Sequence, residues 1–361
     1  MTVEVIAISE PDEMRVFNTF PRVIYRGFFS APSYPPLKHL SCEFMDPLFS
    51  RVTAQPFLAV RNGHPVGRIA ASIHKAYPVK KTGFFGYFES LNDQTVTAAL
   101  VKTATRWLSD NGMSRVIGPV DLTPHERLGL LVEGFTGHHH PGMPYNPPYY
   151  ANLLTGCGFK NEINLFAYFY NLRRPLPDKL LQVANRAAGR IKNLRLREVN
   201  FNDIDNEGKI FSHIHNGSMN NGWGFVPLSA SEGSAIWRKL HGACERGMVL
   251  IAEINGEPAG ICLAIYPIIK QSLPALFSRP SLRLAVLAVL PEHRLKGLEA
   301  ALILEFIRRA RGKGISTIEL SQVAENNLMM NHIIKRLGNN QNERTYRVYQ
   351  AQTDELSSID Y

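Results

Sequence analysis

Two stretches of the sequence are copies of one another: L-A-V-R-N-G-H-P-V-G-R-I-A-A at Leu58–Ala71, and I-A-E-I-N-G-E-P-A-G-I-C-L-A at Ile251–Ala264. In each copy an apolar segment leads into Asn-Gly, and a second apolar segment follows. Asn-Gly accommodates the two positive φ values of a tight hairpin turn. Each copy therefore predicts a β-hairpin.

The segments after the two hairpins repeat one order of elements: a strand, a helix, a strand, a short helix and a last strand. In the first half these are Gly83–Phe88, Asp93–Asn111, Met113–Ile117, Tyr149–Thr155 and Leu165–Tyr170. In the second half they are Leu284–Leu290, Leu298–Arg311, Thr317–Leu320, a helix ending at Gly338, and Tyr346–Gln350. The recurrence predicts an α+β fold of two tandem domains, each a mixed, mostly antiparallel sheet flanked by helices.

The boundary between the halves lies at Asn171–Asp178, which contains two prolines. We expect an N-terminal domain at 1–172, a linker with a basic helix at 173–194, and a C-terminal domain at 195–361. The helix Lys179–Lys192 places apolar residues at helical spacing on one side and basic residues on the other. Its basic side is either a solvated face of an interdomain helix or a docking face for a membrane or an acidic carrier.

The composition is that of a globular protein. Of its 361 residues 45% are hydrophobic and 20% charged, which excludes a disordered chain. The longest uncharged apolar run, Ala259–Ile269, is too short to span a bilayer, which needs ~20 residues. The first residues are acidic where a secretory signal is basic, so we expect a cytoplasmic protein. Four scattered cysteines indicate neither a disulfide framework nor a zinc finger.

The charge of the chain favours anionic partners. Forty Lys and Arg against 31 Asp and Glu give a net charge of +9. A helix-turn-helix, RNP or finger pattern is absent from the sequence and the charges are dispersed, so nucleic acid is not the expected partner. His125 and His138–His140 do not predict a metal site, because three consecutive histidines cannot all face one ion.

The segment P-E-H-R-L-K-G at Pro291–Gly297 lies between the strand Leu284–Leu290 and the helix that follows. A strand that leads through such a turn into a helix presents free N–H groups and the positive end of the helix dipole. This arrangement is typical of a pyrophosphate site, to which Arg294 and Lys296 can add charge-assisted contacts.

These residues resemble the GNAT acyltransferase superfamily, whose pattern V-x-P-x-x-R-x-x-G-x-G/A is represented by Val289, Pro291, Arg294 and Gly297, with Glu299 at the last position. The family's later pattern N-x-x-A-x-x-x-Y-x-K-x-G is represented by Asn327, Met330, Arg336 and Gly338, with Ile334 at the tyrosine. The resemblance implies an acyl-CoA donor, without a metal. It implies donor contacts from Val289, Leu290, Arg294, Lys296, Gly297 and Asn327.

Longer segments resemble a bacterial group of tandem-domain GNAT proteins, and they include Asn221–Glu232, Glu319–Met330 and Met143–Leu154. Some of that group are similar to ceramide synthases, which acylate a long-chain amine. The resemblance implies an N-acyltransferase that moves an acyl group from CoA, or from an acyl carrier protein, to a small-molecule or lipid amine. Glu299 and Ile334 depart from the family pattern, and a non-catalytic GNAT-like binding or regulatory protein is the alternative.

We call the segment Pro291–Gly297 the donor turn. The first copy has no counterpart of it. After Gly83–Phe88 come Glu89 and Asp93, without the Arg or Gly of a phosphate turn. We therefore expect the donor in the second copy and an acceptor site shaped by the first. Candidate acceptor contacts are Glu89, Tyr145, Asn146 and Tyr149 of the first copy, and Trp223 and Phe225 of the loop Asn220–Pro227.

Three residues are candidates for the base that deprotonates the amine: Glu319, Glu253 and His213, with His215 beside the last. Glu319 ranks first because Ile318 and Leu320 flank it, which indicates a buried carboxylate. After the glycine-rich loop, Ser229 and Glu232 form a capping box that predicts the start of a helix.

Overall fold

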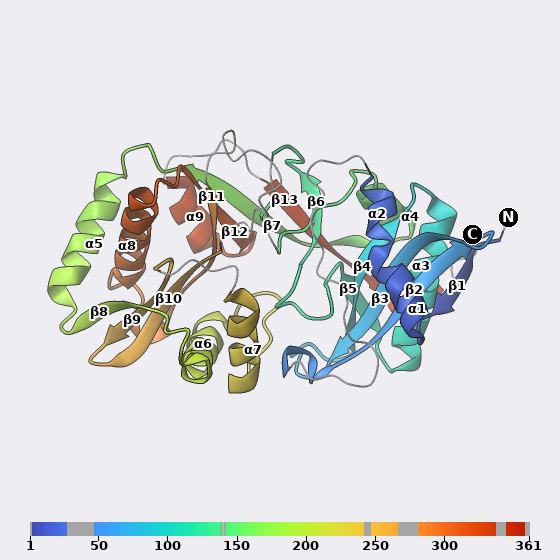
Figure 1. Ribbon diagram of the computed structural model, residues 1–361, viewed down its shortest axis with the longest axis horizontal. Helices are drawn as coiled ribbons and strands as arrows, with labels where there is room; N and C mark the ends of the chain where they lie inside the picture. Colours follow the sequence, from blue (N-terminus) through green and yellow to red (C-terminus); the bar gives the residue numbers. More distant parts are fainter. Residues whose placement is uncertain are drawn as a thin grey trace. The chain divides into compact units, whose positions relative to one another are not determined.

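The computed structural model describes residues 2–26, 47–137, 139–140, 142–241, 247–265, 281–336 and 344–357. The chain divides into two compact units, shown with their elements in Figure 1. Unit 1 comprises Met1–Leu165 with Arg344–Tyr361, and unit 2 comprises Phe166–Glu343. The C-terminal segment therefore belongs with the N-terminal half of the chain.

Unit 1 contains the strand order β1-β2-β3-β4-β5-β13-β7, and β6 also pairs with β13. β4 and β5 are parallel, and the helix α3 connects them. The elements are β1 (Glu4–Ala7), α1 (Pro11–Thr19), α2 (Pro21–Ile24), β2 (Val52–Arg61), β3 (His64–His74), β4 (Thr82–Ser90), α3 (Gln94–Asp110), β5 (Arg115–Gly118), β6 (Leu130–Glu133), α4 (Tyr150–Gly156), β7 (Lys160–Asn171), β13 (Arg344–Gln352) and α10 (Thr353–Ser357).

The sheet of unit 1 separates two hydrophobic clusters. Alternation along β2 and β3 places Phe57 and Ile69 in the cluster that includes α3, and Leu58 and Ala70 in the cluster around Phe17 of α1. Both faces of the sheet are therefore covered.

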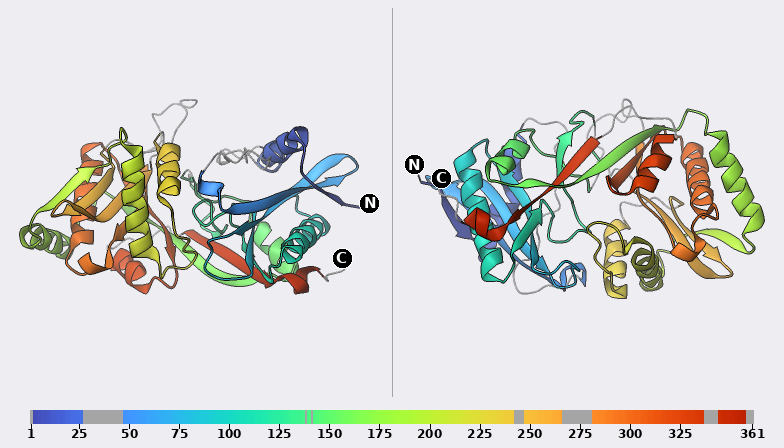
Figure 2. Two further views of the ribbon diagram at one scale, coloured as in Figure 1. Left: turned by 90° about the horizontal axis from the view of Figure 1, so that it is seen from below. Right: turned by 180° about the vertical axis from the view of Figure 1, so that it is seen from behind.

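Unit 2 repeats this plan with the order β7-β12-β11-β10-β9-β8. β11 and β12 are parallel, and α8 connects them. The helices α6 and α7 lie on one face of the sheet, and α8 lies on the other face with α5 outside it (Figure 2). The elements are α5 (Asp178–Arg190), β8 (Leu194–Glu198), α6 (Ile204–Met219), α7 (Ala230–Leu240), β9 (Val249–Ile254), β10 (Glu257–Ile265), β11 (Ser281–Val289), α8 (Leu298–Gly312), β12 (Thr317–Ala324) and α9 (Leu328–Arg336).

The structure confirms the two hairpins and the α+β fold. Asn62 and Asn255 have φ of 52° and 55°, and each precedes a glycine of positive φ. The repeated glycines Gly67 and Gly260 make room for the connecting helices. A Cβ on Gly67 would lie 2.7 Å from Leu100 of α3, and one on Gly260 would lie 3.3 Å from Leu302 of α8.

The last strands of the two halves are exchanged. β13 pairs antiparallel with β5, from Tyr349↔Gly118 to Gln352↔Arg115, and so completes unit 1. β7 contributes Lys160–Leu165 to unit 1, and its remaining residues lie in unit 2 beside β12. The sequence-based division assigns each last strand to its own half. Both strands have the same apolar alternation, which identifies a buried strand but not its neighbour.

The expected basic helix is α5. Its buried residues Ala184 and Ala187 face α8, and the two helices lie side by side (Figure 1). The capping box is also present: Ser229 Oγ accepts the N–H of Glu232 at 3.2 Å, and the Glu232 carboxylate accepts the N–H of Ser229 at 2.7 Å.

Because β13 belongs to unit 1, a destabilising substitution in β13 should affect unit 1. Val348 is fully buried in β13. Val348→Asp should lower the free energy of unfolding by roughly 3 kcal/mol or more, because the carboxylate is buried without a partner. Hydrogen exchange should accelerate in β5 of unit 1. Gln352→Asp, at an exposed position of the same strand, is the control. Faster hydrogen exchange confined to β12 of unit 2 would contradict the assignment of β13 to unit 1.

Candidate active site

β11 and β12 are paired only over their first residues. The pairs run from Ser281↔Thr317 to Leu284↔Leu320, although β11 continues to Val289 and β12 to Ala324. At this point β11 has one extra residue opposite β10, because Leu263 pairs with Val286 and Ala264 with Leu284. A bulge of this kind bends a strand and increases its twist. The strands therefore separate beyond Leu284, and we call this region the β11–β12 divergence.

The N–H of Val289 is directed toward the divergence. The N–H of Leu290 donates to the Ala259 carbonyl of β10 at 2.9 Å. Successive residues of a strand direct their N–H groups to opposite sides, so the N–H of Val289 lies on the β12 side, where pairing has ended. Of the two predicted backbone donors, Val289 is the one whose N–H is placed to meet a ligand carbonyl, since that of Leu290 is used in the sheet.

The turn after β11 leads directly into α8. Gly297 has a φ of 87° and precedes the first residue of this 15-residue helix. A Cβ at Gly297 would lie 3.0 Å from the Ala187 Cβ and 3.1 Å from the Val183 carbonyl oxygen of α5. The left-handed backbone and the close approach of α5 both favour glycine. Because the first N–H groups of a helix have no intrahelical partners, the turn presents an anion-binding helix N-terminus.

Arg294 braces this turn. Its Nε donates to the Val289 carbonyl at 3.0 Å, and its Nη2 donates to the Ser218 carbonyl of α6 at 2.5 Å. Gly217, next to Ser218, packs so closely that a Cβ there would lie 2.6 Å from the Leu290 side chain. The side chain predicted to bind phosphate therefore ties the turn to α6. Its Nη1 makes no hydrogen bond to a described residue.

Four further predicted positions lie near the ends of α8 and α9. Lys296 is exposed in the turn, and Glu299 is half-buried in the first turn of α8. Asn327 accepts the N–H of Met330 at 3.2 Å and so caps α9. Ile334, at the position of the family's tyrosine, is buried with 7% of its surface exposed. Gly338 lies outside the described residues.

Glu319 is fully buried in β12, where it is paired in register with Arg283 of β11. The Ser321 hydroxyl donates to the Glu319 carboxylate at 2.8 Å, and Arg283 Nε donates to the same hydroxyl oxygen at 3.0 Å. This Arg283–Ser321–Glu319 chain lies where the two strands begin to separate. The chain places a buried carboxylate, connected through a hydroxyl, next to the divergence.

The other two base candidates have different surroundings. Glu253 forms an ion pair with Arg197 Nε at 2.5 Å, and Arg197 also pairs with Glu207 of α6. The Glu253 carboxylate is thus held in a network that joins β8, β9 and α6. His213 is exposed on α6.

The glycine-rich loop packs on α6 through His215. The rings of His215 and Phe225 are stacked with centroids 5.4 Å apart, and Trp223 is half-buried nearby in the chain. Asn216 fixes the end of the loop by a pair of 2.8 Å hydrogen bonds with the backbone of Leu228. Burial lowers the pKa of His215, so the neutral ring is favoured in the stack.

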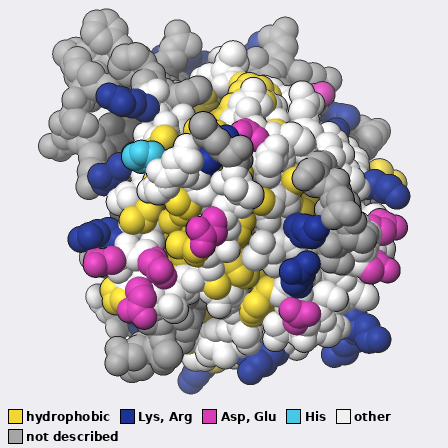
Figure 3. Space-filling view, turned by 90° about the vertical axis from the view of Figure 1, so that its right-hand side faces the viewer, with side chains coloured by type: hydrophobic (Ala, Val, Ile, Leu, Met, Phe, Trp, Pro, Cys, Tyr) yellow, Lys and Arg dark blue, Asp and Glu magenta, His cyan; other side chains and the backbone are white. Residues whose placement is uncertain are grey.

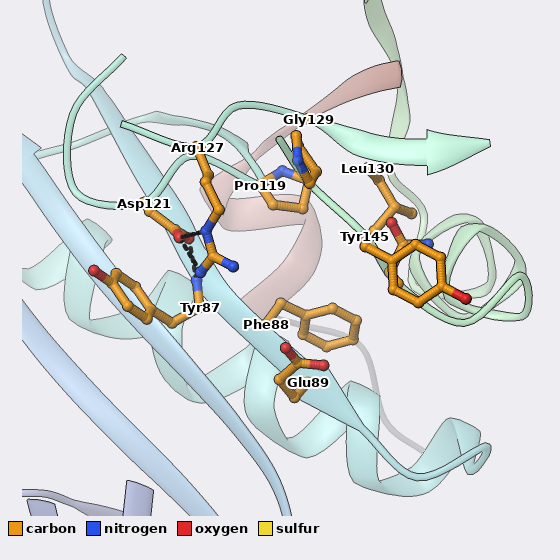
Figure 4. A pocket seen from close by; sticks show the side chains of 11 residues that line it. Tyr87, Phe88, Glu89, Pro119, Asp121, Arg127, Gly129, Leu130 and Tyr145 are labelled. Atoms are coloured by element: carbon orange, nitrogen blue, oxygen red, sulfur yellow. Dashed lines mark hydrogen bonds and ion pairs between the residues drawn. The ribbon is translucent and has the colours of Figure 1, made fainter. Parts of the chain in front are cut away.

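In unit 1 the corresponding strands β4 and β5 also separate, but the chain itself closes the gap. Their pairing ends at Phe84↔Ile117. The N–H of Val120 then donates to the Phe85 carbonyl, and the N–H of Tyr87 donates to the Asp121 carboxylate, both at 2.7 Å. Arg127 holds that carboxylate through its Nε at 2.7 Å (Figure 4).

The end of β4 is closed by two tyrosines of the α4 segment. The N–H of Ser90 donates to the Tyr150 hydroxyl oxygen at 3.0 Å, and the Tyr149 hydroxyl donates to the Ser90 carbonyl at 2.9 Å. Ser90 occupies the place that Val289 has in unit 2: Leu91 and Leu290, the next residues, both donate to the neighbouring hairpin strand. The amide directed at the divergence in unit 2 is thus occupied internally in unit 1.

Glu89 is buried within β4. Its Oε2 accepts the hydroxyl groups of Tyr150 at 2.7 Å and Tyr25 at 3.0 Å, and Arg68 Nη2 lies 3.7 Å from Oε1. Burial raises the pKa of Glu89, while Arg68 and the two hydroxyl groups oppose that rise. Burial and the nearby Glu89 charge raise the pKa of Tyr149 to about 12.

A small cavity of about 40 Å³ is lined by three of the predicted acceptor contacts, namely Glu89, Tyr145 and Asn146. Figure 4 labels Glu89 and Tyr145. The amide of Asn146 is fully engaged with backbone groups, since it accepts the N–H of Leu131 and donates to the carbonyls of Leu131 and Pro147. The cavity is also lined by Asp121 and Arg127, which the sequence did not single out. Their separation of six residues within a loop matches no motif that would identify them.

The described residues contain no group of three or more His, Cys, Asp or Glu side chains that could hold a metal ion. None of their helices is long and apolar enough to cross a membrane.

The comparisons agree with this geometry. Residues 215–338 match the Acetyltransferase (GNAT) family. A tandem GNAT protein from the clavulanic acid biosynthesis pathway superposes with a TM-score of 0.58 at 13% identity, covering 98% of this chain and 99% of that one. The chain therefore has the fold of tandem GNAT proteins. The family match indicates acyltransferase activity.

Two curated relatives and a further solved structure align over nearly the whole chain. Protein YghO of Escherichia coli is 29% identical, with 94% of this chain and 93% of the relative covered. A bacterial ceramide synthase of Caulobacter vibrioides is 27% identical, with 96% and 97% covered. A GCN5-related N-acetyltransferase from Sphaerobacter thermophilus superposes with a TM-score of 0.53 at 12% identity, covering 97% and 96%.

The GNAT turn allows the roles of its two cations to be separated. Arg294→Gln removes the bonds to Val289 and Ser218, so it should lower both the melting temperature and the affinity for CoA, the latter several-fold or more. Lys296→Gln should weaken CoA binding without lowering the melting temperature, because Lys296 is exposed. Calorimetry and thermal unfolding measure both. An Arg294 variant with unchanged affinity and stability would contradict the brace.

The His215–Phe225 stack predicts a pH-dependent loop. The pKa of His215 is lower in the folded protein than in the unfolded chain, so protonation opposes the stack. The stabilisation of the folded state that depends on neutral His215 is complete above pH ~6.5. It decreases as the pH falls toward the pKa of His215 in the folded protein. Hydrogen exchange in residues 220–227, corrected for its intrinsic pH dependence, should rise from pH 7.5 to 5.5. His215→Asn should remove this change, and a persisting change would assign it elsewhere.

Proposed function

We propose that the protein is an N-acyltransferase that uses acyl-CoA as its donor and carries out the transfer in unit 2. The observation that carries this proposal is the β11–β12 divergence, with the N–H of Val289 directed into it and the N-terminus of α8 beyond the same strand. The match to the GNAT family and the tandem GNAT fold support it.

The residues of unit 2 fit the two polar parts of an acyl-CoA. The N–H groups at the start of α8, with Lys296 and Nη1 of Arg294, are placed to bind its pyrophosphate. The N–H of Val289 is placed to polarise the thioester carbonyl as charge develops on its oxygen. The bound thioester supplies an activated acyl group, and the chain contributes orientation and charge stabilisation.

We further propose that Glu319 receives the proton of the attacking amine through Ser321. The Ser321 hydroxyl already donates to Glu319, so it can pass its proton to the carboxylate while it accepts one from the amine. Arg283 holds the hydroxyl oxygen in place from β11. Among the three predicted bases, Glu319 is favoured because Glu253 is held by Arg197 and His213 is exposed.

The acceptor that we propose is a long-chain amine of lipid synthesis. The relative from Caulobacter vibrioides is named a bacterial ceramide synthase, and ceramide formation is acylation of a long-chain amine. An acyl carrier protein thioester is the alternative donor. Trp223 and Phe225 are proposed to contact the acceptor, because they lie in the loop that follows α6, the helix that Arg294 ties to the donor turn through Ser218.

Unit 1 is proposed to bind no donor, since its own Asp121 and Tyr150 occupy the amides that a thioester would need. Its contribution to acceptor binding stays a prediction. Glu89 and Tyr145 line the cavity and are its proposed acceptor contacts, because Asn146 and Tyr149 use their polar groups on the backbone.

The reaction is tested by release of free thiol when the protein is mixed with acyl-CoAs of increasing length and a long-chain amine. Glu319→Gln and Ser321→Ala should each lower kcat at least tenfold and leave the affinity for CoA unchanged. Glu253→Gln and His213→Ala are the matched controls and should retain kcat. Calorimetry should give one CoA per chain.

Absence of thiol release with every acyl-CoA and amine, together with normal CoA binding, would favour a non-catalytic GNAT-like protein, as Ile334 and Glu299 suggest from the sequence. Two CoA molecules per chain would contradict the closure of unit 1.

A further inference from the structure

The outward face of α5 carries cations without counter-charges. Lys179, Arg186 and Arg190 are exposed on the helix, and Lys192 is exposed just after it. None of them forms an ion pair with a described residue, whereas Arg197, Arg238 and Arg309 of the same unit are all paired with carboxylates. Asp178 is the one acidic residue of α5. We call these four cations the α5 basic face.

The length of this face exceeds that of a diphosphate. Lys179 and Arg190 are about 16 Å apart along the helix axis, at 1.5 Å per residue. Because Ala184 and Ala187 are buried, the helix has used its apolar side to pack on α8, and the charged side is left for solvent or for an extended anionic partner.

The donor turn extends the α5 basic face with an apolar group. Gly297 touches Val183 and Ala187 of α5, and two residues earlier Leu295 is 91% exposed in a left-handed conformation with φ of 59°. It is the most exposed large apolar side chain of the residues that the structure describes. Lys296, between them, is also exposed.

The distribution of charge differs from that elsewhere on the protein. On the face of unit 1 that Figure 3 shows, Lys and Arg side chains stand among Asp and Glu side chains. On α5 and just after it there are four cations and one carboxylate, that of Asp178. Glu292 and Glu299 are the acidic residues of the donor turn and of the first turn of α8. The positive potential is therefore centred on α5, and Leu295 lies at its edge.

We propose that the α5 basic face, with Leu295, docks unit 2 on a membrane surface rich in anionic phospholipids. Basic side chains are attracted to such a surface with energies that add along a stripe, and a protruding leucine can enter the boundary between headgroups and acyl chains. An acidic protein would satisfy the cations equally well, but it offers less reason for a fully exposed leucine. The proposal rests on exposure and charge and does not require the acyltransferase reaction.

The test is flotation of the full chain with vesicles, without substrate. The protein should bind vesicles of phosphatidylcholine with about one third phosphatidylglycerol, and should not bind phosphatidylcholine alone. Binding should decrease steeply between about 0.1 M and 0.5 M salt, because screening shortens the range of the attraction.

Variants locate the surface. Arg186→Glu with Arg190→Glu should weaken partitioning at least tenfold. Leu295→Asn should weaken it several-fold and keep the fold, since Asn tolerates a left-handed φ. The control is Arg106→Glu with Lys209→Glu, which changes the net charge equally at exposed positions of α3 and α6. It should bind as the parent does, and unchanged melting temperatures show that each variant is folded.

Three results would overturn the proposal. The first is no binding to anionic vesicles, and the second is an equal loss in the control, which would make the effect one of net charge. The third is displacement of the vesicles by CoA at concentrations near its dissociation constant, which would assign the cations to the donor's phosphates. If an acidic acyl carrier protein binds instead and the α5 variant abolishes that binding, the surface belongs to a protein and not to a lipid.

Discussion

The end of pairing between β11 and β12 at Leu284 and Leu320 is the constraint on which unit 2 depends. Parallel strands need a crossover connection, usually a helix, and here the turn after β11 leads into α8. The bulge in β11 turns its last residues away from β12, and the N–H of Val289 loses a strand partner. A buried amide needs an acceptor, and a ligand carbonyl can provide one. The amide and the helix N-terminus thus arise from the same two strands, a few residues apart.

In unit 1 the strands β4 and β5 also separate, but side chains of the chain itself accept hydrogen bonds from the freed amides. Its amides at Tyr87 and Ser90 are bonded to Asp121 and to the Tyr150 hydroxyl, which come from segments after β5. From the sequence, the negative charge of Glu89 suggested that unit 1 avoids phosphate. In the structure Glu89 lies inside β4, where two tyrosines donate hydrogen bonds to it. The expectation that unit 1 lacks a donor site therefore rests in the structure on internal hydrogen bonds rather than on repulsion.

The sequence predicted the helices and strands better than it predicted which strands lie side by side in the sheet. Asn-Gly and the repeated glycines identified both hairpins, because these residues satisfy local backbone requirements. The exchange of β7 and β13 could not be predicted, since alternation along Tyr346–Gln350 fits either sheet. In the site, the spacing around Arg294 located the turn, but spacing cannot tell whether a guanidinium faces a ligand or a carbonyl of α6. Asp121 could not be predicted, because its partners are the N–H of Tyr87 and the Arg127 side chain, and neither contact leaves a recognisable pattern in the sequence.

The exchange also gives a physical reason for a chain to keep a unit whose donor site is closed. β12 lies between β11 and β7, and the part of β7 that pairs with it belongs to a strand that begins in unit 1. Without β7, β12 would be an edge strand with open hydrogen-bonding groups next to the divergence. Glu319 and Ser321 lie on β12, so their positions depend on that pairing. Unit 1, by anchoring the first half of β7, therefore supports the geometry of β12 in unit 2 even though its own amides at β4 are bonded internally.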